Sequence, residues 1–288
     1  MVKCVSMKQA MKSMLDSRPQ LKALTNAALR SHQLIALNYA VSMTPRYGGA
    51  AHPALHDMIA EDSDSYRALL NSFLVYKERL AATTRVQWVN GYLPGLDSIA
   101  IYCLLAETNP KRYVEIGSGN STLFARASIR DNKLRTRITS IDPTPRRNIE
   151  DVSDEILRKP AETIPLEYFG ELEPGDILFV DNSHRCFTNS DVTVFFVDIL
   201  PLLNPGTLVH LHDIWLPWDY PADVAQQAYS EQYLLATAML MGSRIKPVLP
   251  NKFIERTPEL VSILDPILNL LGNVERLGCS FWFTTVPR

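Results

Sequence analysis

Cysteine is scarce in this 288-residue sequence, and its four copies are widely separated. Cys4, Cys103, Cys186 and Cys279 form no C-x-x-C pair, the spacing that many zinc and redox motifs use. The sequence therefore gives no indication of a zinc site or of a disulfide framework. Free thiols are typical of a reducing compartment, so we expect a cytoplasmic protein.

A long apolar segment and a strong net charge are also missing. The first residues include Lys3, Lys8 and Lys12, but no apolar run as long as a signal peptide or a membrane span. The net charge of −2 provides no electrostatic attraction for nucleic acid or for an anionic membrane. We expect neither of these partners, and a small molecule or a local peptide as the substrate.

The most informative stretch is residues 112–122, Arg-Tyr-Val-Glu-Ile-Gly-Ser-Gly-Asn-Ser-Thr. Its first five residues suit a buried strand, and one of the last three can cap a helix. Gly117 and Gly119 allow a sharp turn between them, and the missing Cβ lets the main chain approach a ligand closely. This order of strand, tight turn and helix start is typical of a nucleotide-binding α/β unit.

Further strands follow at the spacing of a doubly wound sheet. Residues 137–141 predict a second strand that ends in Asp142, where a ribose diol would be held. Other strands are expected over 155–158, 175–181, 206–213, 244–249 and 279–285, with helices over 191–203 and 222–241. The succession predicts a mostly parallel, Rossmann-like sheet with ligands at the carboxyl ends of its strands, where Glu115, Asp142, Asp181 and Asp213 fall.

The N-terminal third has a different pattern. Helical spacing runs over about 5–39 and again over 62–85, where Tyr66, Leu70 and Phe73 belong to the expected buried face. We therefore predict a helical cap or substrate region over 1–90 and the Rossmann-like domain over 91–288.

Taken together, these residues resemble the class I S-adenosylmethionine-dependent methyltransferases, in particular the branch that acts on small molecules. The resemblance covers about Tyr92 to Thr285, and its most distinctive pieces are residues 114–121, 139–143, 181–184 and 210–214. It implies one antiparallel strand near the sheet edge, supplied by 279–285, and methyl transfer to an oxygen or nitrogen of an unidentified small molecule. The residues that it assigns to S-adenosylmethionine are Glu115, Gly117, Ser118, Gly119, Asn120, Ser121, Asp142 and Asp181.

Two other functions stay open at this point. An NAD(P)-dependent oxidoreductase also has a glycine turn and an acidic second strand end, and Arg146 and Arg147 can hold a 2′-phosphate. The dinucleotide fingerprint, however, has glycine or alanine where this chain has Thr122. The other alternative is a non-catalytic nucleotide-binding module of the same fold.

A second polar cluster is expected where the fourth and fifth strands of the sheet end. Asp181 and His184 follow one strand and His212 and Asp213 follow the next, so their side chains should meet. We interpret His184, His212 and Asp213 as the catalytic group. His184 is the first candidate for the base and His212 the second, because an unperturbed histidine has a pKa of about 6.5. A purely structural role in capping or loop hydrogen bonds is the alternative.

The resemblance also implies a possible divalent cation. Related small-molecule O-methyltransferases hold one with acidic residues at these two strand ends, which correspond to Asp181, His212 and Asp213. An imidazole in place of a carboxylate weakens the case for magnesium and leaves manganese, iron or no metal open. Trp215 and Trp218 can form an apolar wall for the acceptor or anchor the core. The oligomeric state is open, a homodimer included.

Overall fold

The structure is a computed structural model, and it describes residues 41–242 and 244–287. The chain divides into two compact units, Met1–Met43 and Thr44–Arg288, and the second contains every element given below. The helices expected over 5–39 lie outside the described residues. The boundary expected near residue 90 stays a prediction.

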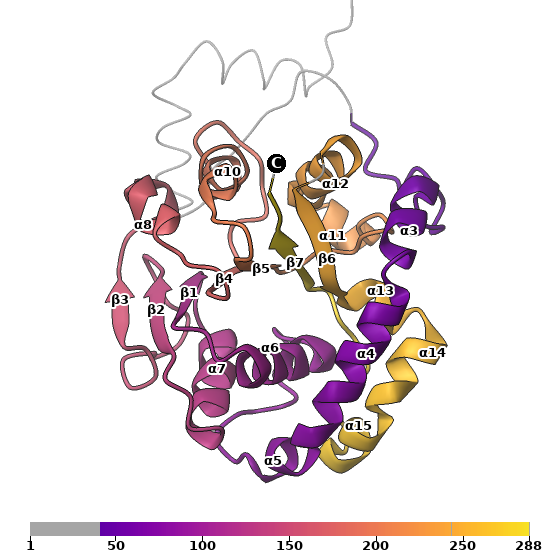
Figure 1. The fold of residues 1–288 in the computed structure, drawn as a ribbon. Coiled ribbons are helices and arrows are strands. Elements are labelled where there is room, and N and C mark those ends of the chain that lie inside the picture. The colour runs from indigo at the N-terminus through magenta and orange to yellow at the C-terminus, as the bar shows by residue number, and fades with distance from the viewer. Residues whose placement is uncertain (1–40, 243, 288) are drawn as a thin grey trace, which may run out of the picture. The chain divides into compact units, whose positions relative to one another are not determined.

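A seven-stranded sheet forms the centre of the second unit, in the order β3-β2-β1-β4-β5-β7-β6 (Figure 1). Its strands are β1 (Arg112–Ile116), β2 (Arg137–Ile141), β3 (Glu155–Leu157), β4 (Ile177–Val180), β5 (Leu208–Leu211), β6 (Ile245–Pro250) and β7 (Phe281–Thr285). The first five strands pair in parallel, and β7 runs antiparallel to both β5 and β6. The predicted Rossmann-like sheet with one antiparallel strand near its edge is confirmed.

The strand register brings the predicted site residues to one edge. Ile116 is opposite Ile141 and Val180, and Val180 is opposite Leu211. The residues that directly follow these four therefore form a row at the carboxyl ends of four adjacent strands. That row consists of Gly117, Asp142, Asp181 and His212.

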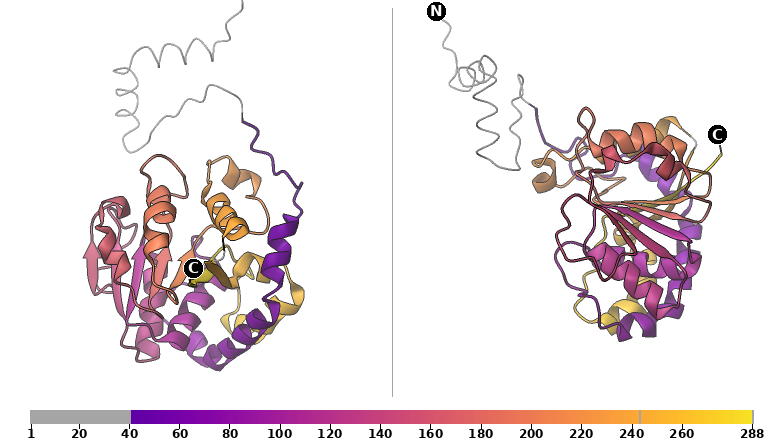
Figure 2. Two further views of the ribbon diagram at one scale, coloured as in Figure 1. Left: turned by 45° about the horizontal axis from the view of Figure 1, so that its top comes forward. Right: turned by 90° about the vertical axis from the view of Figure 1, so that its left-hand side faces the viewer.

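Helices cover both faces of the sheet. Helices α6 (Gly95–Thr108) and α7 (Asn120–Asp131) lie on one face, and α8 (Leu166–Gly170), α10 (Leu200–Leu202) and α12 (Glu231–Met241) lie on the other (Figures 1 and 2). The remaining helices are α3 (Pro53–Ala60), α4 (Ser63–Phe73), η1 (Leu74–Tyr76), α5 (Lys77–Ala82), η2 (Ala161–Thr163), α9 (Asp191–Val194), η3 (Phe195–Ile199), α11 (Ala222–Ala225), α13 (Asn251–Glu255), α14 (Pro258–Val261), η4 (Ser262–Leu264) and α15 (Asp265–Leu271). Within the described ranges, no helix is long and apolar enough to cross a bilayer.

One predicted helix is interrupted. Residues 222–241 do not form a continuous helix, because the chain leaves α11 after Ala225 and begins α12 at Glu231. Ala228 has a φ of 60°, and the amide of Ser230 donates a hydrogen bond to the carbonyl of His184 at 2.8 Å. This tether places the first residue of α12 beside the strand ends.

Candidate active site

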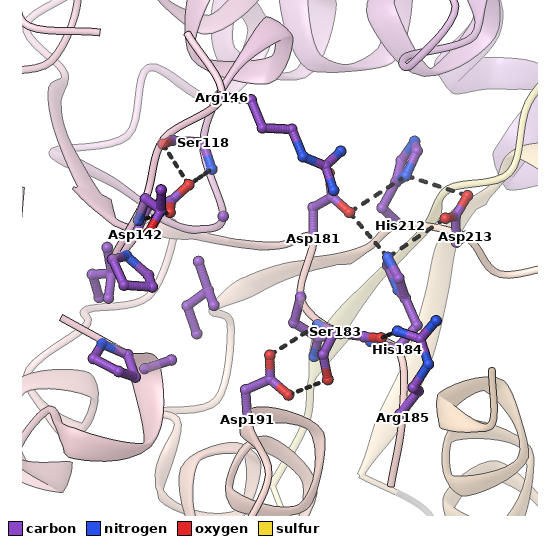
Figure 3. Close-up of a pocket in the computed structure, with 18 of the residues that line it drawn as sticks. Ser118, Asp142, Arg146, Asp181, Ser183, His184, Arg185, Asp191, His212 and Asp213 are labelled. Carbon is purple, nitrogen blue, oxygen red and sulfur yellow. Dashed lines mark hydrogen bonds and ion pairs between the residues drawn. The ribbon is translucent and has the colours of Figure 1, made fainter. Parts of the chain in front are cut away.

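A cavity of about 880 Å³ opens at the carboxyl ends of β1, β2, β4 and β5 (Figure 3). A smaller one, of about 290 Å³, adjoins the start of α7. Glu115 is the one predicted site residue that lines neither cavity. The predicted residues that do line them are Gly117, Ser118, Gly119, Asn120, Ser121, Asp142, Asp181, His184, His212 and Asp213.

The glycine turn is shaped by a close approach between two strand ends. Gly117 has a φ of 80°, and a Cβ on it would lie 2.0 Å from the carbonyl oxygen of Asp181. Beyond it, the amide and hydroxyl of Ser118 both donate to one carboxylate oxygen of Asp142 at 2.9 Å. The amide of Thr144 donates to the other oxygen at 2.8 Å. These bonds fix the Asp142 carboxylate at the cavity wall.

Glu115 lies beneath the turn and lines neither cavity, so its contact with a cofactor stays a prediction. Its side chain is fully buried. One carboxylate oxygen accepts hydrogen bonds from Thr122 Oγ1 and Ser140 Oγ, both at 2.5 Å, and the other accepts from Ser121 Oγ at 3.2 Å. Thr122 Oγ1 also accepts from the amide of Gly119 at 3.0 Å, so the threonine in place of a fingerprint glycine ties the turn to Glu115.

Glu115→Gln is expected to remove a pH-dependent part of the stability. Burial, which outweighs the three hydroxyl hydrogen bonds, raises the pKa of Glu115 from 4.5 to about 7. The folded protein then holds a proton that the unfolded chain releases, so this group's contribution to stability falls as the pH rises from 4.5 to 7. Between these limits wild type should lose about 2–3 kcal/mol more unfolding free energy than the variant.

Urea denaturation on either side of this window measures the difference. Glu173→Gln, at an exposed carboxylate, is the matched control and should follow wild type. Equal losses in wild type and in Glu115→Gln would show that Glu115 is ionised throughout.

His184 is held by three carboxylates. Its Nε2 lies 3.3 Å from Asp181 Oδ1 and 3.5 Å from Asp213 Oδ2 (Figure 3). Its Nδ1 hydrogen-bonds to Glu231. Burial alone would lower the pKa of His184, but the charge of Glu231 and the hydrogen bond to Asp181 raise it to about 10. At neutral pH this raised pKa favours the imidazolium form of the ring.

The second histidine also lies among carboxylates. His212 Nδ1 lies 3.5 Å from Asp213 Oδ1 and 3.8 Å from Asp181 Oδ1, while its Nε2 lies 3.5 Å from Asp97 Oδ2. Burial would lower the pKa of His212, but Cys279 and the neighbouring carboxylates of Asp213 and Asp181 raise it above its usual range. The role of His184 or His212 as a general base stays a prediction; the carboxylates around His184 favour its protonated form, which donates hydrogen bonds.

Three residues of this site were missed in the sequence. Asp97 lies in α6, Tyr229 lies in the interruption before α12, and Glu231 is the first residue of α12. The Tyr229 ring is 4.5 Å from that of His184 and also lines the larger cavity. Trp215 and Trp218, expected as an apolar wall, do not line that cavity; Trp218 instead packs beneath Arg256 at 4.5 Å.

Residues 114–214 match a family model described as a methyltransferase domain. This stretch contains the glycine turn, Asp142, Asp181, His184, His212 and Asp213. The match over this stretch and the sheet topology agree with the resemblance to class I methyltransferases drawn from the sequence.

Several solved structures are similar to this chain at low identity. A Podospora anserina methyltransferase with SAH bound is 16% identical over 83% of this chain and 100% of its own, with a TM-score of 0.43. A Bacillus cereus O-methyltransferase in complex with SAH is 14% identical over 82% and 99%, with a TM-score of 0.39. A Streptomyces achromogenes O-methyltransferase involved in tomaymycin synthesis, in complex with SAM, is 17% identical over 67% and 89%, with a TM-score of 0.37. No curated protein sequence matches the chain.

Proposed function

We propose that this protein transfers the methyl group of S-adenosylmethionine to an oxygen or nitrogen of a small molecule. The observation that carries the proposal is one continuous cavity with the glycine turn and Asp142 at one end and the Asp181, His184 and Asp213 cluster at the other. Its volume, about 880 Å³, lies within the range of small-molecule sites. Two ligands placed at these ends would meet inside the same cavity.

The residues at the turn fit the cofactor. A Cβ on Gly119 would meet no atom within 4 Å, so the main chain there borders open space that a ligand can fill. Asp142 presents an oriented carboxylate for the ribose hydroxyls, as at other ribose sites. The carboxylates of Glu162, Asp181 and Asp213 also line the cavity and suit a ligand that carries a sulfonium and an ammonium group. S-adenosylmethionine supplies the electrophilic methyl group, so the protein's task is alignment.

The charged cluster would position the acceptor and take its proton. The side chains of Asp181 and Asp213 are 41% and 24% exposed, which leaves carboxylate oxygens open to the cavity. Burial would raise the pKa of Asp181, but the charges of His212 and His184 hold it below its usual range. Because the Asp181 carboxylate is the more exposed of the two, we assign to it the acceptance of the proton from the acceptor. We assign to His184 the donation of a hydrogen bond to the oxygen or nitrogen that loses this proton.

The location that we propose is the cytoplasm. Cys103, Cys186 and Cys279 are all free thiols. Free thiols persist in a reducing compartment.

Asp142→Ala is expected to weaken binding of S-adenosylmethionine by about tenfold to a hundredfold, because a hydrogen bond to a charged group contributes about 1.5–3 kcal/mol. Isothermal titration calorimetry measures the affinity directly. Asp151→Ala, which removes an exposed carboxylate from the same region, is the matched control and should bind like wild type.

Two results would contradict the proposal. Tight binding of NAD(H) or NADP(H), with none of S-adenosylmethionine, would indicate the oxidoreductase. Binding of S-adenosylmethionine without methyl transfer to any of a broad panel of phenols, carboxylates and amines would indicate the non-catalytic module.

A further inference from the structure

Three buried side chains of types that bind metals, those of Asp97, His212 and Cys279, meet at the Nε2 side of the His212 ring. Asp97 comes from α6, His212 follows β5, and Cys279 lies two residues before β7. They are 0%, 4% and 6% exposed. Among the residues that the structure describes, they are the group whose donor atoms all lie within 4.8 Å of one another.

The spacing of these atoms is that of ligands around a single ion. Cys279 Sγ lies 3.8 Å from His212 Nε2 and 3.5 Å from Asp97 Oδ2, and His212 Nε2 lies 3.5 Å from Asp97 Oδ2. A point equidistant from the three atoms is about 2.1 Å from each, which agrees with zinc–nitrogen and zinc–oxygen distances of about 2.0–2.2 Å and a zinc–sulfur distance of about 2.3 Å. An ion fits without movement of the backbone.

The surrounding contacts orient each ligand. Asp97 Oδ1 accepts hydrogen bonds from Ser280 Oγ at 2.6 Å and from Asn251 Nδ2 at 2.7 Å. Asp97 Oδ2 accepts from the amide of Cys279 at 2.9 Å and also faces His212 Nε2 and Cys279 Sγ, each at 3.5 Å. On the opposite side of the imidazole ring, His212 Nδ1 faces Asp213 Oδ1 at 3.5 Å. A carboxylate on the second nitrogen of a ligating histidine is a common feature of zinc sites, where it fixes the ring and its tautomer.

We propose that Asp97, His212 and Cys279 bind a zinc ion. Thiolate, imidazole and carboxylate together favour zinc over magnesium, which prefers oxygen ligands. On binding, the Cys279 thiol and the His212 imidazolium each release a proton to solvent, and the thiolate and carboxylate balance the two positive charges. The ion links α6, the end of β5 and the start of β7, and fixes His212 at the cavity wall.

This site differs from the metal set predicted in the sequence. Asp181 and Asp213 lie on the Nδ1 side of His212, and both are also within 3.5 Å of His184 Nε2. Asp97 and Cys279 lie on the Nε2 side and do not line the larger cavity. The proposed zinc site shares His212 with the set that the resemblance implies, and Cys279 Sγ also donates to Asp213 Oδ1 at 3.4 Å, but its other two ligands differ. It does not depend on methyl transfer.

Titration of the metal-free full-length protein with cobalt(II) tests the proposal. Cobalt bound to a thiolate gives a charge-transfer band in the near ultraviolet, so one equivalent should produce this band and added zinc should remove it. Cys279→Ser should abolish the band, and Asp97→Asn should weaken cobalt binding at least about tenfold. Cys186→Ser, at an exposed thiol, and Asp181→Asn should both keep it.

A variant with Cys279 as its single thiol (Cys4→Ser, Cys103→Ala, Cys186→Ser) gives an independent reading should Cys279→Ser fail to fold. It should show the full band. Three results would overturn the proposal: no saturable cobalt binding by wild type, a band that survives in Cys279→Ser, or cobalt bound without a band and lost in Asp181→Asn.

Discussion

Glu231→Ala is expected to lower the free energy of unfolding by about 3–5 kcal/mol, because it leaves a buried imidazolium without its main partner. The side chains of His184 and Glu231 are 7% and 1% exposed, so water cannot replace the lost carboxylate. The remaining carboxylates, Asp181 and Asp213, face the other ring nitrogen at 3.3 and 3.5 Å. Neither can reach Nδ1 without a movement of the strand ends.

Chemical denaturation at neutral pH measures this loss. The matched control is Glu173→Ala, which breaks an ion pair with Lys111. The side chain of Glu173 is 57% exposed and that of Lys111 is 76% exposed. Exposed pairs of this kind contribute less than about 1 kcal/mol. A loss of similar size in the two variants would show that the His184–Glu231 pair is not a buried ion pair.

Gly117→Ala is expected to destabilise the protein by more than about 3 kcal/mol and to weaken S-adenosylmethionine binding at least about tenfold. A left-handed backbone conformation costs a non-glycine residue about 1–3 kcal/mol. The added Cβ would also lie 2.0 Å from the carbonyl oxygen of Asp181, so β1 and β4 must separate where they end. That separation displaces Ser118, and with it the hydrogen bonds that hold Asp142.

Gly175→Ala separates the two causes. Gly175 has a φ of 89°, but a Cβ there meets no atom within 4 Å. Gly175→Ala should therefore be destabilised by the left-handed backbone conformation alone, with no contact between the new Cβ and another residue. It should leave the affinity for S-adenosylmethionine unchanged. Equal denaturation midpoints and equal affinities for the two variants would show that the strand ends separate easily at Gly117.

The sheet and the edge that carries the site could be predicted because both depend on local sequence. Apolar runs such as 177–180 and 208–211 mark buried strands, and a polar residue directly after each must lie at the carboxyl edge of a parallel sheet. Asp142, Asp181 and His212 were found in this way. Their grouping follows from strand register alone.

The protonation states and the deeper partners could not be predicted, because they depend on contacts distant in sequence. Glu231 faces His184 through an interruption in an apparently continuous helical pattern, and no spacing rule reports it. Asp97 and Cys279 are 182 positions apart, far outside any metal-binding motif. Glu115 stands at a strand end like Asp142, yet its side chain lies on the covered face of the sheet, where Ser140 and Thr122 enclose it.

The position of β7 has a consequence for how the sheet is completed on the ribosome. The chain makes β6 before β7, but β7 lies between β5 and β6 and supplies the ladder hydrogen bonds to both. During synthesis β5 and β6 each keep an unpaired edge until Thr285 has left the exit tunnel, and such edges invite pairing with other chains. A premature stop before Phe281 would therefore leave β5 as an open edge and β6 without a partner strand, a product prone to aggregate.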